Sequence, residues 1–317
     1  MVKQNINLYL ASPRGFCAGV DRAVKIVEQA IKKYGSPIYV RHEIVHNKDV
    51  VKSLESLGAI FVDEITDAPE NSTIIFSAHG VPKSVFVNAK KRKMLSIDAT
   101  CPLVTKVHNE TIKHFNSHRK ILLIGHKNHP EVVGTMGQVP DGNVILIENL
   151  NEAKNIYIED TNNLAYATQT TLSVDDTKEI IEVLKQRFPG IKGPSTEDIC
   201  YATTNRQLAV KSMANVCDYV LVIGAQNSSN SQRLVEVAKK NGVSNSYLIS
   251  EEYDLNVFLN KLNFKNSINI GLTAGASAPE TLVQVLISKL KKKFDVNLID
   301  HEVVKEDIIF NLPKVLR

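Results

Sequence analysis

The chain has 317 residues, enough for two or three compact domains, and its 43% hydrophobic and 6% aromatic content is typical of an ordinary globular protein. Its 38 basic and 34 acidic residues leave a net charge of +4, which is too small to indicate a nucleic-acid partner and does not repel a small anionic substrate. Because the sequence has neither a membrane-length apolar run nor an N-terminal secretory signal, we expect a cytoplasmic protein with no membrane partner.

Short apolar runs predict β-strands along the whole chain. They occupy residues 6–12, 37–44, 59–65, 72–80, 120–125, 143–149, 164–170, 219–224, 246–250 and 267–275. Helical patterns lie between them, and the first is the clearest because Val20, Ala23, Val27 and Ala30 share one face and Gly35 follows as a stop signal. Strands that alternate with helices predict an α/β fold of mostly parallel sheets with helices on both faces.

Three cysteines, Cys17, Cys101 and Cys200, each lie at the start of a predicted helix. A helix N-terminus lowers a thiol pKa and favours the thiolate that binds metal. Three thiolates leave a tetrahedral metal one ligand short, which is typical of a catalytic site. Three separately buried thiols would be the alternative, while Cys217, before an apolar run, is predicted to be an inert core residue.

The cysteines lie at nearly even intervals, which predicts three similar small α/β domains, each a mostly parallel sheet flanked by helices. We expect these domains at residues 1–98, 99–196 and 197–298, with the tail at 299–317 as a candidate addition to the first. In parallel sheets, ligands bind beyond the carboxyl ends of the strands, so the loops there are the places to look for chemistry.

Three histidines lie at the carboxyl ends of predicted strands or in the loops after them, namely His46, His79 and His129. Imidazoles at strand ends can donate hydrogen bonds to phosphate oxygens or accept protons near neutral pH. A single loop histidine is more often an ordinary surface group, but three in equivalent positions favour a shared role. His126 and His129 could also form a metal pair, of which we favour one member as functional.

Glu131, just after Pro130, is predicted either to be a first-turn acid that suits the helix dipole or to deliver a proton near the metal. Thr170, at the end of a strand, could orient that acid through a hydrogen bond. The alternative is that Thr170 belongs only to the turn before the next helix, where Ser173 and Asp176 form a capping-box pattern.

A polar loop before the helix at 231–242 offers Ser228, Ser229 and Asn230 as a cradle for phosphate. Ser277 is predicted to be the N-cap of the following helix, since Pro279 and Glu280 come after it, and an N-cap hydroxyl can also contact an anion. The chain contains neither a Walker-type phosphate loop nor a dinucleotide fingerprint.

The segments SPRGFCAGVDRA, RHEIVHN, SAHGVP, DATCPLV, HPEVVGTMGQ, TQTTLS and NSSNSQRL together closely resemble the 4-hydroxy-3-methylbut-2-enyl diphosphate reductases, which act last in the methylerythritol phosphate route of isoprene biosynthesis. The resemblance covers essentially the whole chain. It implies three domains in a pseudo-threefold trefoil around one [4Fe-4S] cluster per chain, with Cys17, Cys101 and Cys200 as its three cysteine ligands.

The same resemblance implies the roles of the remaining residues. Diphosphate contacts carry over to His46, His79, His129, Ser228, Ser229, Asn230 and Ser277. Glu131 matches the family's proton donor, and Thr170 matches the threonine that orients the substrate hydroxyl. The implied reaction is reductive dehydroxylation to isopentenyl and dimethylallyl diphosphate at an open iron, with two external electrons from a donor such as ferredoxin or flavodoxin.

Two other functions are compatible with the cysteine pattern alone. A three-thiolate zinc hydrolase would use Glu131 as a base, and a non-enzymatic iron-sulfur sensor would regulate a partner without turnover. Neither explains why serines and histidines should surround the same centre.

Overall fold

The computed structural model describes residues 3–250, 252–262 and 268–317. Predictions that fall on residues 1–2, 251 and 263–267, including the first position of the strand expected at 267–275, lie outside the described residues. The chain divides into two compact units, which are described separately. Unit 1 contains Met1–Cys17, His46–Lys48 and Tyr201–Ile309, and unit 2 contains Ala18–Val45, Asp49–Cys200 and Phe310–Arg317.

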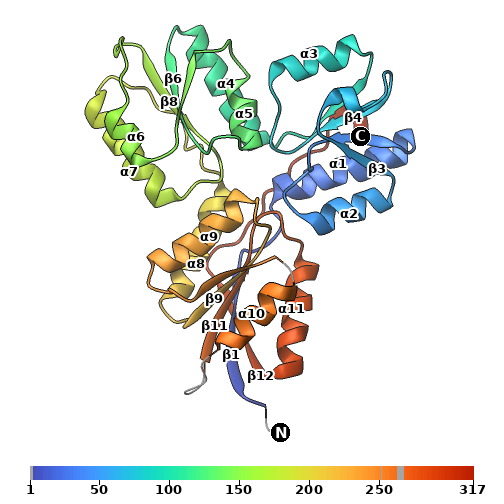
Figure 1. Cartoon of the computed structure of the whole chain (residues 1–317), viewed down its shortest axis with the longest axis vertical. Helices are drawn as coiled ribbons and strands as arrows, with labels where there is room; N and C mark the ends of the chain where they lie inside the picture. The colour runs from blue at the N-terminus through green and yellow to red at the C-terminus, as the bar shows by residue number, and fades with distance from the viewer. Residues whose placement is uncertain (1–2, 251, 263–267) are drawn as a thin grey trace. The chain divides into compact units, whose positions relative to one another are not determined.

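Unit 1 is built on a parallel sheet with the strand order β10-β9-β11-β1-β12 (Figure 1). Its strands are β1 (Asn5–Ser12), β9 (Tyr219–Ile223), β10 (Ser246–Ile249), β11 (Ile268–Ala274) and β12 (Asp295–Glu302). Its helices are α8 (Tyr201–Ala214), α9 (Ser229–Lys240), α10 (Glu252–Lys261) and α11 (Glu280–Lys293). Helices α8 and α9 cover one face of the sheet, and α10 and α11 cover the other.

Unit 2 holds two further parallel sheets. The first has the order β3-β2-β4-β5 and is flanked by helices; its elements are α1 (Ala18–Tyr34), β2 (Ile38–Arg41), α2 (Lys48–Ser56), β3 (Ala59–Val62), β4 (Thr73–Phe76), α3 (Lys83–Lys91) and β5 (Leu95–Asp98). The short 3-10 helices η1 (Ile65–Asp67) and η2 (Lys314–Leu316) accompany it.

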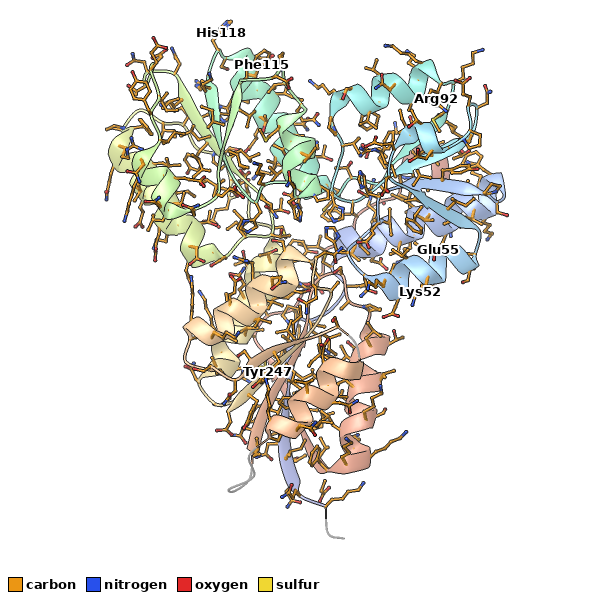
Figure 2. The ribbon with its side chains drawn as sticks, viewed as in Figure 1. Lys52, Glu55, Arg92, Phe115, His118 and Tyr247 are labelled. Atoms are coloured by element: carbon orange, nitrogen blue, oxygen red, sulfur yellow. The ribbon has the colours of Figure 1, made fainter. Side chains whose placement is uncertain are left out.

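The second sheet of unit 2 has the order β7-β6-β8. Its elements are α4 (Pro102–Asn116), β6 (Lys120–Ile124), α5 (Pro130–Met136), β7 (Val144–Ile147), α6 (Leu150–Asn155), β8 (Leu164–Thr168) and α7 (Val174–Arg187). Both faces are apolar because helices cover both of them: α4 and α5 pack on one face, and α6 and α7 pack on the other. Figure 2 shows side chains filling the space between each sheet and its helices.

The prediction of parallel sheets flanked by helices is confirmed, because every strand pair in the three sheets is parallel. The predicted membership of the first strand is wrong. Residues 5–12 were expected in the first domain, but β1 lies between β11 and β12 in the sheet of unit 1. In unit 1 the strand is hydrogen-bonded on both sides, and the side chains of Leu8 and Leu10 are buried there under the helices of that unit.

The predicted domain boundaries at 98 and 196 stay a prediction, as does the trefoil arrangement. Of the tail, residues 299–309 belong to unit 1, whereas Phe310–Arg317 belong to unit 2, where Lys33 of α1 donates to the carbonyl oxygen of Val315 at 2.7 Å. No helix of the described residues is long and apolar enough to cross a membrane.

Candidate active site

Each of the three predicted ligand cysteines lies at the start of a helix. Cys17 directly precedes α1, Cys101 is the N-cap of α4, and Cys200 directly precedes α8. All three thiols are partly exposed, whereas Cys217 is buried in the core of unit 1, where burial, helped by Asp218, raises the pKa of its thiol to about 12. The contrast supports the prediction that Cys217 is inert, because only a thiolate binds metal.

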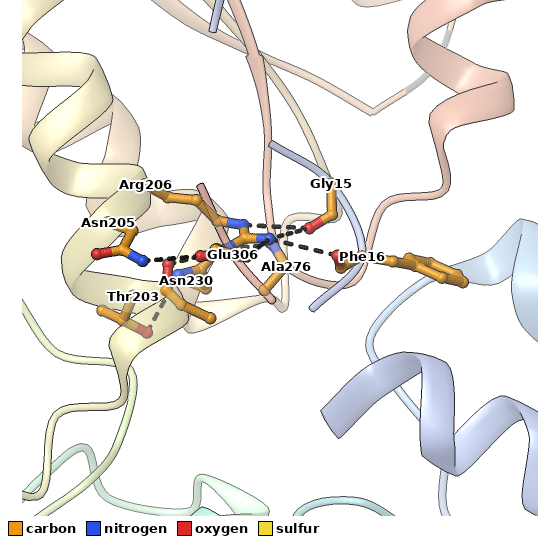
Figure 3. A network of polar contacts seen from close by, with 9 residues as sticks. Gly15, Phe16, Thr203, Asn205, Arg206, Asn230, Ala276 and Glu306 are labelled. Carbon is orange, nitrogen blue, oxygen red and sulfur yellow. Dashed lines mark hydrogen bonds and ion pairs between the residues drawn. The ribbon is translucent and has the colours of Figure 1, made fainter. Parts of the chain in front are cut away.

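In unit 1, a short chain of contacts joins several of the predicted residues. The N–H of Cys17 donates to the carbonyl oxygen of Ala276 at 3.3 Å. Ala276 in turn donates its own N–H to the side chain of Asn230 at 2.8 Å, as Figure 3 shows. The next residue, Ser277, donates its hydroxyl to the carbonyl oxygen of His46 at 3.0 Å. Unit 1 therefore brings Cys17, His46, Asn230 and Ser277 together.

The contact from Ser277 corrects a prediction. Ser277 was expected to be the N-cap of α11, but Pro279 occupies that position and no side chain caps the helix there. The Ser277 hydroxyl is used instead to fix the backbone at His46. Sequence spacing could not show this, because the accepting carbonyl lies more than two hundred residues away.

The predicted phosphate cradle lies at the N-terminus of α9. Ser228 is its N-cap and accepts a hydrogen bond from the N–H of Ser231, while Ser229 and Asn230 form the first turn. The imidazole of His46 contacts the amide of Asn227, just before the cap, at 3.3 Å. A helix N-terminus whose backbone N–H groups and hydroxyls lie beside an imidazole is suited to bind an anion.

In unit 2, His79 and His129 lie next to each other, with ring centroids 5.9 Å apart and the planes at 88°. Two glycines allow this approach. A Cβ on Gly134 of α5 would lie 3.1 Å from the backbone of Gly80, and one on Gly137 would lie 2.4 Å from the side chain of Pro82. Nothing in the sequence marks these glycines as contact points, although they bring helix α5 against the loop that carries His79.

Glu131 and Thr170 form the hydrogen-bonded pair that their residue types suggest. Glu131 is in the first turn of α5, which begins after the N-cap His129. One carboxylate oxygen accepts the backbone N–H of Thr170 at 2.6 Å, and the other accepts its hydroxyl at 2.9 Å. Both residues are buried, so Glu131 is more than a solvated acid at a helix end. The backbone carbonyl oxygen of Thr170 accepts the N–H of Cys200 at 3.0 Å, which links the acid to one of the predicted ligand cysteines.

Burial raises the pKa of Glu131 to about 7. The two hydrogen bonds from Thr170 oppose this shift because they favour the carboxylate, but desolvation is the larger effect. A nearby carboxylate, Asp198, adds to the shift in the upward direction. Burial also raises the pKa of Asp198, although Lys106 and the N–H of Thr168 hydrogen-bond its oxygens. Glu131 can therefore hold a proton near neutral pH, as a general acid requires.

This pKa predicts a pH-dependent stability. Between the ordinary glutamate pKa of 4.5 and about 7, the folded protein keeps a proton on Glu131 that the unfolded chain has lost. The free energy of unfolding should therefore fall as the pH rises through that window, by about 3 kcal/mol from this group. We expect urea unfolding of the apoprotein to show this component, and Glu131→Gln to lack it. Parallel pH curves for the two proteins would contradict the raised pKa.

The predicted site residues thus fall into two groups. Unit 2 brings together Glu131, Thr170, Cys200 and the imidazoles of His79 and His129. Cys101 belongs to the same unit, where its N–H donates to the carbonyl oxygen of Ala78, beside His79, at 2.9 Å. Among the residues that the structure describes, no three His, Cys, Asp or Glu side chains are gathered closely enough to hold one metal ion.

Comparisons with known proteins point in one direction. The family model described as "LytB protein" matches residues 8–291. A 4-hydroxy-3-methylbut-2-enyl diphosphate reductase of Hyphomonas neptunium is 55% identical, covering 99% of this chain and 98% of the relative. One from Bradyrhizobium diazoefficiens is 54% identical, covering 99% of this chain and 97% of the relative.

Two solved structures are also similar. The E-1-hydroxy-2-methyl-but-2-enyl-4-diphosphate reductase of Plasmodium falciparum is 40% identical with a TM-score of 0.92, covering 100% of this chain and 97% of that one. A second structure, described as an (E)-4-hydroxy-3-methyl-but-2-enyl diphosphate reductase and the terminal enzyme of the non-mevalonate pathway, is 30% identical with a TM-score of 0.63, covering 90% and 99%.

Proposed function

This chain belongs to the LytB protein family, and from that membership we propose that it reduces (E)-4-hydroxy-3-methylbut-2-enyl diphosphate to isopentenyl and dimethylallyl diphosphate. Its relatives are named as reductases of this substrate, which makes the chain an oxidoreductase. The observation that carries the proposal is the buried Glu131–Thr170 pair, hydrogen-bonded to Cys200 through the Thr170 backbone.

The reaction removes an allylic hydroxyl as water. One C–O bond breaks and one C–H bond forms, so two electrons and two protons are consumed. Glu131 supplies the proton that the leaving oxygen needs, because its raised pKa keeps it protonated near neutral pH. Thr170 holds the carboxyl group in one orientation through two hydrogen bonds, and its hydroxyl lies beside that group to position the substrate oxygen. The second proton goes to carbon, for which the bound diphosphate is a candidate source.

The three partly exposed thiols at helix starts fit the ligands of an iron-sulfur cluster. We infer that Cys17, Cys101 and Cys200 hold one [4Fe-4S] cluster. When bound, such a cluster supplies a path for the electrons and a Lewis-acidic iron without a protein ligand. The electrons would come from a partner such as ferredoxin or flavodoxin, and we place the enzyme in the cytoplasm, where thiols stay reduced.

We further propose that the diphosphate binds to two sets of donors. In unit 1 these are His46, Ser277 and the start of α9 with Ser228, Ser229 and Asn230, where backbone N–H groups and the helix dipole favour negative charge. In unit 2 they are the adjacent imidazoles of His79 and His129. Contacts to the diphosphate alone would hold the small, flexible hydrocarbon part of the substrate in position, even if that part made no polar contacts itself. Such positioning lowers the activation barrier of the reaction.

The decisive experiment is anaerobic purification with iron and sulfide counting, followed by an assay with the hydroxylated diphosphate and reduced methyl viologen. We expect about four irons per chain and formation of both products. Zinc without iron would point to hydrolysis instead. A stable iron-sulfur cluster without turnover would point to a sensor.

A further inference from the structure

Three cations hold the loops that lead into the predicted ligand cysteines. Each is a lysine or arginine on a helix, and each donates hydrogen bonds to backbone carbonyl oxygens a few residues before a cysteine. The three are Arg22, Lys106 and Arg206, named here the brace cations. Each contact lies within one of the two compact units.

Arg206 of α8 holds the loop before Cys17, as Figure 3 shows. Its guanidinium donates to the carbonyl oxygen of Gly15 at 2.7 and 3.1 Å and to that of Phe16 at 3.3 Å. The carboxylate of Glu306 lies 3.1 Å from the same guanidinium and balances its charge. The Arg206 side chain is 0% exposed, so these carbonyls have a charged donor that does not exchange with water.

Arg22 of α1 holds the loop before Cys101. Its Nη1 donates to the carbonyl oxygens of Ala99 and Thr100 at 3.3 and 3.1 Å, and its Nε donates to that of Asn311 at 2.9 Å. Ala99 and Thr100 are the two residues immediately before Cys101, just as Gly15 and Phe16 immediately precede Cys17.

Lys106 of α4 holds the loop before Cys200. Its Nζ donates to the carbonyl oxygens of Thr196 and Glu197 at 2.6 and 2.8 Å. It also contacts the buried carboxylate of Asp198 at 3.1 Å, whose other oxygen accepts the N–H of Thr168 at 2.9 Å. The loop is therefore attached both to α4 and to the end of β8.

The three contacts follow a cyclic order. Arg22 is five residues beyond Cys17, Lys106 is five residues beyond Cys101, and Arg206 is six residues beyond Cys200. The helix after Cys17 holds the loop before Cys101, the helix after Cys101 holds the loop before Cys200, and the helix after Cys200 holds the loop before Cys17. The loop before each cysteine is thus hydrogen-bonded by the helix that begins at another cysteine.

We infer that the brace cations are positioning residues that keep the three cysteines in place for cluster retention, an inference that rests on the proposed function. Backbone carbonyls in these loops need donors, and a long cationic side chain from a neighbouring helix supplies them while restricting the loop. Without its cation, a loop gains freedom and its thiolate leaves iron more easily. The cyclic order means that each loop depends on a different helix.

The test compares Arg22→Gln, Lys106→Gln and Arg206→Gln with wild type after anaerobic reconstitution. The control is Arg187→Gln. Arg187 likewise donates to two carbonyl oxygens, those of Ala153 and Ile156, at 2.6 Å each, but neither acceptor lies in a loop that leads into a cysteine. Losing a partner behind a metal ligand usually lowers metal affinity roughly 10–100-fold, so we expect iron release to a ferrous chelator to be faster by about that factor in the brace variants. The control should stay within about twofold of wild type, well below that range.

Lys106→Gln decides the outcome, because its side chain is 26% exposed and its loss disturbs folding less than loss of the fully buried Arg206. The double variant Lys106→Gln/Asp198→Asn removes the unpaired buried charge that the single variant leaves behind. If Lys106 acts as a brace cation, iron release should stay fast in the double variant. Recovery of wild-type retention there would overturn it, because the defect would then come from the Asp198 charge.

Two further readouts separate positioning from general stability. The electron paramagnetic resonance spectrum of the reduced cluster should change in Lys106→Gln, while the thermal midpoint of its apoprotein matches that of Arg187→Gln. Unchanged spectra and unchanged iron release in all the brace variants would reject the inference. A wild-type protein that takes up no [4Fe-4S] cluster would instead reject the proposed function.

Discussion

Replacing Glu131 with glutamine is expected to slow turnover by about 10²–10⁴-fold, the usual contribution of a positioned general acid. The amide has nearly the same shape as the carboxyl group, and its oxygen can still accept the N–H of Thr170, which lies 2.6 Å from the carboxyl oxygen. It has no acidic proton for the departing hydroxyl. The variant should therefore keep the fold and the cluster and lose only the chemical step.

The measurement is turnover at saturating substrate with reduced methyl viologen, together with iron and sulfide content. Glu152→Gln provides a matched control, because Glu152 is also an acid in the first turn of a helix, α6, but hydrogen-bonds only locally to Glu148 and Asn149. We expect the control to match wild type. A Glu131→Gln enzyme with full cluster and near-wild-type turnover would remove the proton-donor role.

The same substitution should change the pH profile. Because the pKa of Glu131 is raised to about 7, the fraction of enzyme with this proton falls as the pH rises above that value. Wild-type turnover should therefore decline on the alkaline side of about pH 7, whereas the residual turnover of the variant should not share that limb. The direction is opposite to that of a general base, whose activity would rise over the same range.

The sequence predicts the parts of this molecule that depend on local pattern. Buried parallel strands such as β6 and β9 are continuous apolar runs, so they were placed correctly. The strands β5 and β12 were missed because they lie at sheet edges and are mostly exposed, which leaves their sequences too polar to resemble a buried strand. The position of β1 was wrong because its partners, β11 and β12, lie at the other end of the chain.

The candidate site likewise has features that the sequence predicts and features that it does not. Cysteines at helix starts and Ser173 as the N-cap of α7 were predictable, since capping patterns are local. The bond between Glu131 and Thr170 was suggested by residue type and then found in the structure. The contacts of Arg22 and Lys106 could not be predicted, because every residue has a backbone carbonyl and the accepting residue's type therefore gives no information. Their equal spacing from Cys17 and Cys101 was the one available signal.

The largest expected effect is loss of the cluster when any one of Cys17, Cys101 or Cys200 is replaced with serine. A serine hydroxyl is far less acidic than a thiol and does not supply the soft anionic ligand that iron-sulfur clusters need. Loss of a group that only supports a metal ligand already costs roughly 10–100-fold in affinity, so loss of a ligand itself should cost more. We expect each variant to retain little iron after reconstitution and gel filtration and to have no measurable turnover.

Cys217→Ser is the matched control because it makes the same atomic change on a thiol whose pKa burial raises to about 12. Cys217 packs in the core of unit 1 with Met213 and Val220, so serine there should lower the thermal midpoint modestly while iron content stays at the wild-type value. Measuring both quantities for all four variants separates ligation from packing. Iron loss in Cys217→Ser with iron retention in Cys101→Ser would show that the ligand set is different. Iron loss in the other three variants alone would support three cysteine ligands. One iron of a four-iron cluster would then have no protein ligand, and the substrate hydroxyl could bind there.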